Sequence, residues 1–255
     1  MITAEIPIAR RQVVTATLEE RLVLWRSVAT ERGYSFWNEC APEFFGGLMF
    51  REGHGVTVNA VIDATDATSP FFAGNVSGRY GAEKTEVTTA FVAIPLARSM
   101  PSMVLVNTRK GALREAQISM GSRQRLSLEG DFDEAFTLYC PLETGPQALA
   151  VFTPVMVQLF LDSAPESDVE IVDDWMFIYV RSGRFEPAAG LDRVERVVRS
   201  VHDTIVTRDA PPVGVQPASS AAARLAPSLI GVQLLGLVAF AVLLVAVIGL
   251  TGSAL

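Results

Sequence analysis

Four carboxylates lie close together in the stretch SLEGDFDEAFTLYCP, residues 127–141, and are the first candidates for chemistry: Glu129, Asp131, Asp133 and Glu134. Such a cluster could hold a divalent cation or move protons. Its alternating acids resemble the start of a calcium loop, but the glycine and the later glutamate of that loop are missing at the required offsets. A turn is the alternative, because Phe132 and Phe136 would share one face of a helical turn that Asp131 caps. We predict an acidic turn followed by a strand ending at Pro141.

A second candidate is the acid pair Asp173-Asp174 in DVEIVDDWMFIYV, residues 168–180. Apolar residues alternate on both sides of the pair, as they do in strands. Aspartate also tolerates the backbone conformation of a two-residue turn. Between a catalytic pair and a hairpin turn, we predict the hairpin.

The two histidines, His54 and His202, have no Cys, His or carboxylate at a recognised metal-ligand spacing. Ser77 in GNVSG lacks the spacing of a nucleophile elbow, and the sequence contains no phosphate-binding or dinucleotide-binding glycine motif. We therefore predict no catalytic residue, no metal and no cofactor. The net charge of −7 argues against a nucleic-acid partner, which requires a basic surface.

Cys40 and Cys140 are the only cysteines. One disulfide between them is possible, but two cysteines so far apart do not make the framework of a secreted scaffold. Because both lie beside apolar or aromatic residues, we predict two buried, reduced thiols.

The elements that must position these residues indicate an α+β domain over residues 1–208. A capping box, Thr17 and Glu20, predicts a helix over 17–33, with Trp25 on its apolar stripe as a core residue and not a binding platform. Residues 34–130 contain short β-branched and aromatic runs without intervening helices, which predicts a mainly antiparallel sheet. About three helices pack on it; two of them are expected from Thr153-Pro154 onward and over 190–208.

Residues 228–250, SLIGVQLLGLVAFAVLLVAVIGL, carry no charge. A helix of that length reaches about 34 Å, enough to cross a hydrocarbon core of about 30 Å. A buried core helix is the alternative, but a helix that is apolar on every face favours the membrane. We predict a transmembrane helix over 228–250 with a short tail, 251–255.

Proline- and alanine-rich residues 209–227 predict a flexible linker between the domain and this helix. The N-terminus lacks the features of a signal peptide, and the arginines flanking the helix, Arg208 and Arg224, lie on its N-terminal side. We therefore expect a tail-anchored protein of the inner cell membrane, single-pass, whose main domain is cytoplasmic.

Three motifs carry a resemblance to known proteins: the spacing of Phe132 and Phe136 before a strand, the helix opening with Thr153-Pro154, and the acid pair Asp173-Asp174. With these motifs the sequence resembles a group of uncharacterised bacterial membrane proteins that share a domain of unknown function. The match is clear over residues 127–181. Over residues 34–106 it is limited to the general β-like pattern of the sequence. It implies a membrane-associated α+β domain, and it brings no activity and no catalytic residues.

A basic segment, residues 108–125, stands out in this acidic chain. It is either a solvated loop or a surface that faces anionic lipid headgroups, to which each basic residue would add about 1 kcal/mol. Its basic residues are Arg109, Lys110, Arg114, Arg123 and Arg125.

We expect a non-catalytic binding or scaffolding module with the lipid bilayer and a protein as partners. The alternative is a membrane-tethered enzyme, such as a hydrolase, whose site joins residues distant in sequence. A deep pocket lined by His54 or by carboxylates would favour the enzyme.

Overall fold

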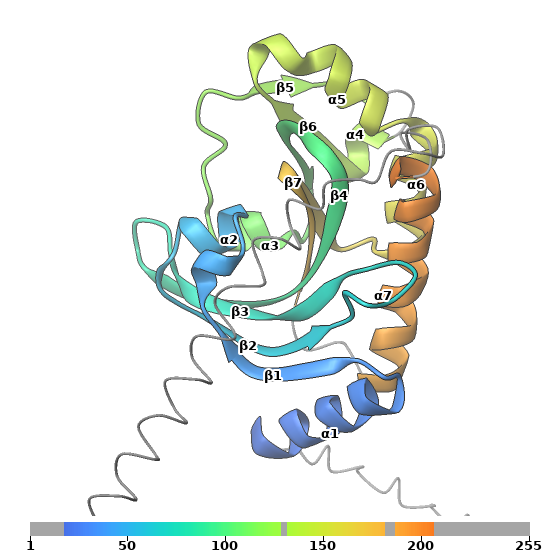
Figure 1. Cartoon of the computed structure of the whole chain (residues 1–255). Helices are drawn as coiled ribbons and strands as arrows, with labels where there is room; N and C mark the ends of the chain where they lie inside the picture. Colours follow the sequence, from blue (N-terminus) through green and yellow to red (C-terminus); the bar gives the residue numbers. More distant parts are fainter. Residues whose placement is uncertain (1–17, 129–131, 182–186, 207–255) are drawn as a thin grey trace, which may run out of the picture. The chain divides into compact units, whose positions relative to one another are not determined.

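The computed structural model describes residues 18–128, 132–181 and 187–206, all of which belong to one unit, residues 1–208. Its strands form a seven-stranded sheet in the order β1-β2-β3-β4-β6-β5, with β7 paired to β4 (Figure 1). The strands are β1 (Ser35–Cys40), β2 (His54–Asp63), β3 (Phe72–Tyr80), β4 (Thr85–Asn107), β5 (Gln124–Leu126), β6 (Phe136–Cys140) and β7 (Ser167–Arg181).

Every strand pair is antiparallel, so the predicted α+β class with an antiparallel sheet is confirmed. The helices are α1 (Leu18–Glu31), α2 (Leu48–Arg51), α3 (Ala112–Glu115), α4 (Phe132–Ala135), α5 (Gly145–Val151), α6 (Pro154–Ser163) and α7 (Pro187–Val201). Short helical turns are η1 (Pro42–Phe44), η2 (Leu142–Thr144) and η3 (His202–Val206).

Strand β4 organises the sheet, because it is 23 residues long and pairs with three other strands. Its first half lies between β3 and β7, and its second half lies between β6 and β7. The pairing with β7 shifts register between Pro95 and Met103. A proline is tolerated at such an irregularity because it has no N–H to donate to the ladder.

The predicted hairpin at Asp173-Asp174 is wrong. β7 runs as one strand of 15 residues, and its two halves pair with the two halves of β4 instead of with each other. Asp173 does adopt the left-handed backbone of a turn residue, with φ of 54°, but it does so in the bulge opposite Met100. The sequence signal for a left-handed aspartate was correct, and only its structural setting was misread.

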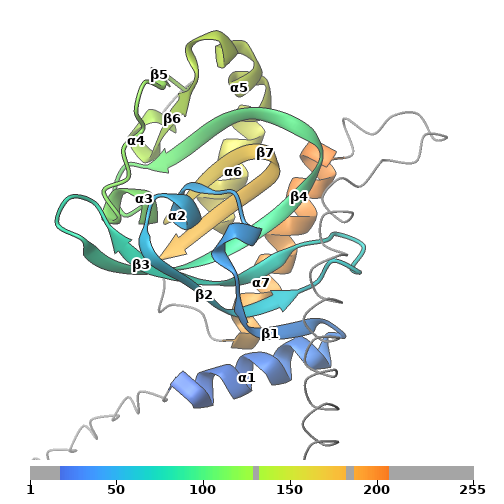
Figure 2. The same cartoon turned by 60° about the vertical axis from the view of Figure 1, so that its left-hand side comes forward.

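The main hydrophobic core lies between the sheet and the three longest helices. α6 and α7 follow one side of the sheet, α1 packs beside β1, and α2 lies on the opposite side (Figures 1 and 2). Fully buried core side chains come from each layer, for example Ile94 and Leu105 of β4, Phe160 of α6 and Val198 of α7. Burial of such apolar side chains supplies most of the stability of this layer.

The opposite side of the sheet is covered by an aromatic cluster beneath α2. Trp175, Phe177 and Tyr179 stack along β7, with ring centroids 6.1 and 6.0 Å apart. Phe45 and Phe50 pack edge-on or tilted against these rings. Aromatic contacts of this kind fix the orientation of the rings as well as burying apolar surface.

Several local predictions are confirmed. α1 ends before Gly33, which has a φ of 77°, and Thr153 caps α6 by accepting a hydrogen bond from the Met156 N–H at 3.4 Å. The amphipathic pattern of residues 190–208 corresponds to α7 and η3, although α7 already begins at Pro187. Cys40 and Cys140 are both free thiols, as predicted. Cys140 is buried, whereas Cys40 is only half-buried, so the prediction of burial is wrong for Cys40; partial burial still raises the pKa of Cys40 to about 11.

The predicted linker 209–227, transmembrane helix 228–250 and tail 251–255 lie outside the described residues. Among the residues that are described, no single helix has the length and hydropathy to cross a membrane. One bent pair, Leu142–Val151 and Pro154–Ser163, meets that criterion on length and composition alone, with an angle of 67° between its parts.

Candidate functional site

Of the predicted acidic cluster, Asp133 and Glu134 lie in α4, whereas Glu129 and Asp131 fall outside the described residues. Asp133 accepts hydrogen bonds from the Leu128 N–H at 2.8 Å and the Ser127 hydroxyl at 2.5 Å. These bonds, with Leu128 first, lower the pKa of Asp133. Asp133 therefore fastens the turn to the preceding segment. Across the described ranges, no three His, Cys, Asp or Glu side chains gather as metal ligands would.

The histidines lie apart from each other and from the acids. His54 is exposed at the start of β2, opposite Arg79. The Nε2 atom of His202 lies 3.4 Å from the Pro70 carbonyl oxygen, and burial lowers the pKa of this histidine. The structure brings neither of them to the acid pair of β7.

Two buried carboxylates in β7 were not singled out from the sequence. Asp168 is wholly buried and accepts hydrogen bonds from the N–H groups of Asn107 and Leu113, both at 2.7 Å. Burial raises its pKa to about 6, against the opposing effect of these bonds. A Cβ atom at position 111 would overlap this carboxylate, so Gly111 is needed for the loop to approach it. Asp168 thus holds the β4–α3 connection against β7.

Glu170, which also lies in β7, holds α2 in a similar way. Its Oε2 atom accepts hydrogen bonds from the Leu48 N–H and the Tyr179 hydroxyl, both at 2.7 Å. Burial raises its pKa, whereas the bond from Tyr179 and then that from Leu48 lower it. Its Oε1 atom is buried and has no partner within the part of the chain that is described. Both acids bind backbone groups of neighbouring segments, which is a structural role.

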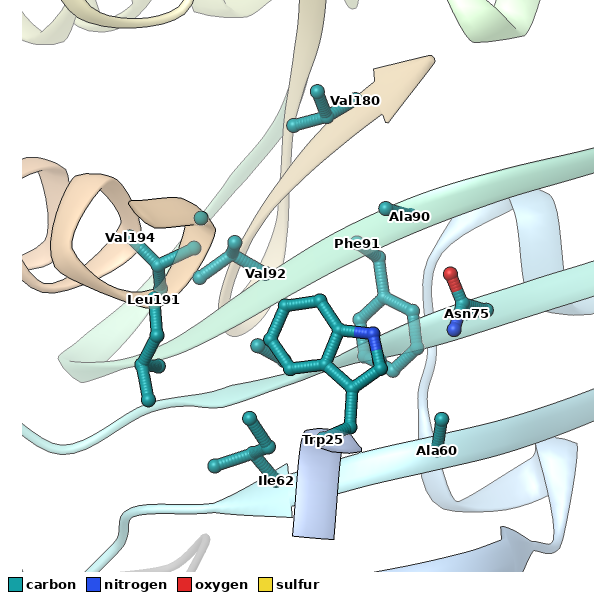
Figure 3. A pocket seen from close by; sticks show the side chains of 13 residues that line it. Trp25, Ala60, Ile62, Asn75, Ala90, Phe91, Val92, Val180, Leu191 and Val194 are labelled. Carbon is teal, nitrogen blue, oxygen red and sulfur yellow. The ribbon is translucent and has the colours of Figure 1, made fainter. Parts of the chain in front are cut away.

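The first cavity of interest lies between α1, α7 and the sheet and holds about 50 Å³ (Figure 3). Trp25 of α1 forms one wall, and Leu191 and Val194 of α7 form another. The predicted core role of Trp25 is therefore only part of its setting, because the half-buried ring contacts the core and also lines this cavity.

Small residues create the space of the first cavity. They are Ala60, Ala73, Ala90 and Gly190. Ala60 lies at the irregularity of β2 and has a φ of 53°, a conformation that alanine rarely adopts. Strained backbone of this kind is more frequent at functional sites than elsewhere.

The second cavity, about 170 Å³, lies at the other flank of α7, against the end of α6. Its floor is apolar and includes Ile178 of β7. Val92, Val180 and Val194 line both cavities, so the two form one feature, which we call the α7 groove. Glu166 and Arg193 are its charged lining residues.

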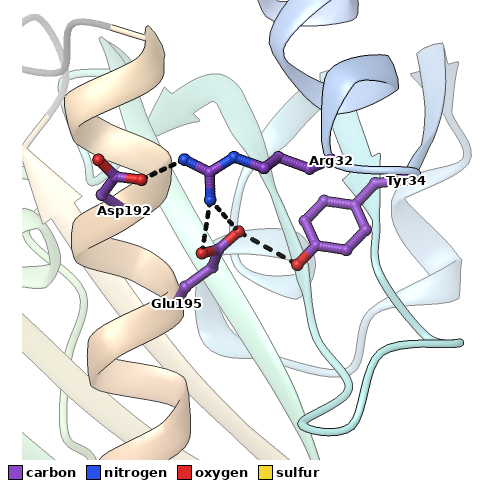
Figure 4. A network of polar contacts seen from close by, with 4 residues as sticks. All are labelled: Arg32, Tyr34, Asp192 and Glu195. Atoms are coloured by element: carbon purple, nitrogen blue, oxygen red, sulfur yellow. Dashed lines mark hydrogen bonds and ion pairs between the residues drawn. The ribbon is translucent and has the colours of Figure 1, made fainter.

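Two salt bridges and a hydrogen bond tie the residues directly after α1 to α7 at the side of the first cavity (Figure 4). The guanidinium of Arg32 binds Asp192 and donates to both carboxylate oxygens of Glu195, at 2.9 and 2.7 Å. The Tyr34 hydroxyl also donates to Glu195, at 3.1 Å. The hydrogen bond to Asp192 makes the largest contribution to raising the pKa of Arg32.

A wide third cavity, about 580 Å³, opens beside this network and is lined by Tyr34, Glu195, Arg199 and Asp203 among others. The carboxylate of Glu195 is already engaged by Arg32 and Tyr34. Neither His54 nor His202 lines it, or lines the α7 groove. Glu195 and Tyr34 therefore serve the contact between α7 and the residues that follow α1, and the mainly apolar α7 groove is the better candidate for a binding site.

Comparison with known proteins gives a similar solved structure. No protein-family model and no curated protein sequence matches the chain. The solved structure is the crystal structure of the mycobacterial trehalose monomycolate transport factor A, TtfA. It has 14% sequence identity and a TM-score of 0.50, and the match covers 76% of this chain and 98% of that one. At such an identity the likeness shows a shared fold.

The basic segment is spread over a turn, α3 and the start of β5. Lys110 pairs with Glu166 at 3.2 Å, and Arg114 donates to the Thr108 carbonyl at 2.5 Å. Arg123 donates to the Met120 carbonyl at 3.2 Å, while Arg109 and Arg125 are exposed. Three of the five side chains thus have local partners. Whether this surface faces lipid stays a prediction.

Proposed function

We propose that this protein is a non-catalytic binding module, attached to the cytoplasmic face of a membrane, that holds an apolar segment of a protein partner in the α7 groove. Helix 228–250 would provide the attachment, and linker 209–227 would keep the domain near the bilayer.

The α7 groove is the observation that carries the proposal. Its linings are mainly aliphatic, and its larger cavity holds about 170 Å³. An apolar cavity of about 150 Å³ accommodates one group of the size of benzene. The groove therefore fits single apolar side chains, and buried apolar anchors in such cavities supply much of the affinity of protein interfaces.

The shared fold supports a role without catalysis. The similar solved structure is described as a trehalose monomycolate transport factor, a description compatible with a membrane-associated module that binds and does not catalyse. The exposed Arg109 and Arg125 would add attraction to anionic headgroups.

Site-specific photo-cross-linking in native membranes tests the binding role. A cross-linking residue replaces Arg193, exposed at the groove, in the full-length protein; in a second version it replaces Arg196, exposed elsewhere on α7. We expect a discrete protein adduct from position 193 and a much weaker one from position 196. The partner would then be identified by mass spectrometry of the adduct.

A variant whose larger side chain fills the α7 groove provides the control for the cross-linking experiment. Val194→Phe should remove the adduct from position 193, because Val194 lines both cavities. Val23→Phe, on an α1 residue that is 65% exposed, should leave it unchanged. Equal adducts from positions 193 and 196, unaffected by Val194→Phe, would contradict the proposal.

A further inference from the structure

Two polar groups in the first cavity have no hydrogen-bond partner among the described residues. No described residue accepts a hydrogen bond from the indole N–H of Trp25, and none forms a hydrogen bond with the side-chain amide of Asn75. Both residues line the cavity, and the indole nitrogen lies on the side of the ring nearer to Asn75 (Figure 3). Asn75 lies in the middle of β3 and is paired with Asn59 and Ala90 on the two neighbouring strands, so the sheet fixes the position of its backbone.

These groups have a defined chemistry. The Trp25 indole only donates a hydrogen bond, whereas an asparagine amide donates through its nitrogen and accepts through its oxygen. A peptide bond offers the complementary carbonyl and N–H together. We propose that the first cavity binds a peptide bond of an extended partner segment, while the apolar side chain beside that bond enters the α7 groove.

A lipid acyl chain is the alternative occupant of an apolar groove, and the same two groups disfavour it. A hydrocarbon chain would exclude water from Trp25 and Asn75 and could not replace the hydrogen bonds that water makes to these side chains. Leaving one buried polar group unpaired costs about tenfold in affinity, or more. Peptide therefore fits the cavity better than hydrocarbon does.

Charge at the second cavity specifies the segment further. Arg193 is exposed there and has no hydrogen bond or ion pair with any described residue, whereas Glu166 is paired with Lys110. An acidic side chain of the partner would complement Arg193. The proposed occupant is thus an apolar peptide segment flanked by an acidic residue, and this inference rests on the proposed function.

Nuclear magnetic resonance of the tryptophan indole groups tests the inference. The full-length protein is labelled with ¹⁵N-tryptophan and placed in lipid nanodiscs; it has three tryptophans, and Trp25→Phe assigns the signal of Trp25. The probe is N-acetyl-L-leucine methylamide, which carries peptide bonds and one apolar side chain. We expect a saturable shift of the Trp25 signal, with the signals of Trp37 and Trp175 unchanged.

Substitution of the amide gives the quantitative result. Asn75→Leu should weaken binding of the probe about tenfold. The matched variant Asn38→Leu changes an exposed amide on β1, outside the groove, and should have no such effect. Unchanged Trp37 and Trp175 signals show that a variant has kept its fold. If Asn75→Leu disturbs them, Asn75→Ala removes the same amide with less added bulk.

Paramagnetic lipid separates the two occupants. Nanodiscs that contain doxyl-labelled phospholipid should not broaden the Trp25 signal more than those of Trp37 and Trp175. Selective broadening of Trp25, or no response to the amide probe, would overturn the inference. An adduct from position 193 combined with either result would reject only the peptide-bond contact, whereas loss of that adduct would reject the proposed function itself.

Discussion

Asp168 shows how one buried residue makes stability depend on pH. Its pKa is raised from 3.8 to about 6 by burial, so the folded protein binds this proton more tightly than the unfolded chain does. The stability that protonation provides is complete below about pH 4 and is lost as the pH rises through about 6. A pKa that is about two units higher in the folded than in the unfolded protein changes the free energy of unfolding by about 3 kcal/mol.

Chemical denaturation of the wild type and of Asp168→Asn from pH 4 to pH 7 measures this effect. The advantage of the wild type in free energy of unfolding should shrink as the pH rises, because the variant has no titrating group at this position. Asp133→Asn is a control of opposite sign: the Asp133 pKa is lowered, so its contribution is lost as the pH falls. A constant difference between wild type and Asp168→Asn would show that Asp168 keeps an ordinary pKa.

At the scale of elements, the contact between α1 and α7 depends on Arg32. Its partners Asp192 and Glu195 both belong to α7, and the side chain of Arg32 is 37% exposed. Because exposed ion pairs contribute little, Arg32→Gln should lower the free energy of unfolding by no more than about 1 kcal/mol. Its local effect should be larger, since α1 would open more often.

Hydrogen exchange detects that opening. Arg32→Gln should speed amide exchange in Leu18–Glu31 and leave β4 unchanged. Arg196→Gln, which alters an exposed arginine elsewhere on α7, should change neither. Equal protection of α1 in the wild type and in Arg32→Gln would mean that apolar contacts alone hold this helix.

The elements also show what a sequence reveals. α1, α6 and α7 follow from local signals, namely apolar spacing, the Thr153 cap and the glycine after α1. The continuity of β7 does not, because the left-handed backbone of Asp173 is the same in a hairpin turn and in a bulge. Only pairing with the distant β4 decides between them. The α7 groove likewise joins residues from seven elements, namely α1, α6, α7 and the strands β2, β3, β4 and β7, and no local pattern marks it.

At the scale of the whole molecule, residues 228–250 should decide where the protein resides. The full-length protein should stay in the membrane pellet after carbonate extraction, because an uncharged helix of this length is stable in hydrocarbon. A chain that ends at Arg208 should leave that pellet. Recovery of the full-length protein in the carbonate supernatant would contradict the predicted anchor.

The long strand β4 also lacks its partner β7 during part of protein synthesis. The Thr89 hydroxyl donates to the carbonyl of Val180, which is 91 positions later in the chain. A ribosome adding about 5–20 residues per second needs roughly 5–20 seconds to cover that interval. Throughout it, one edge of β4 has no strand to pair with, and unpaired edges promote association with other chains. The nascent protein is therefore most exposed to aggregation before β7 leaves the ribosome.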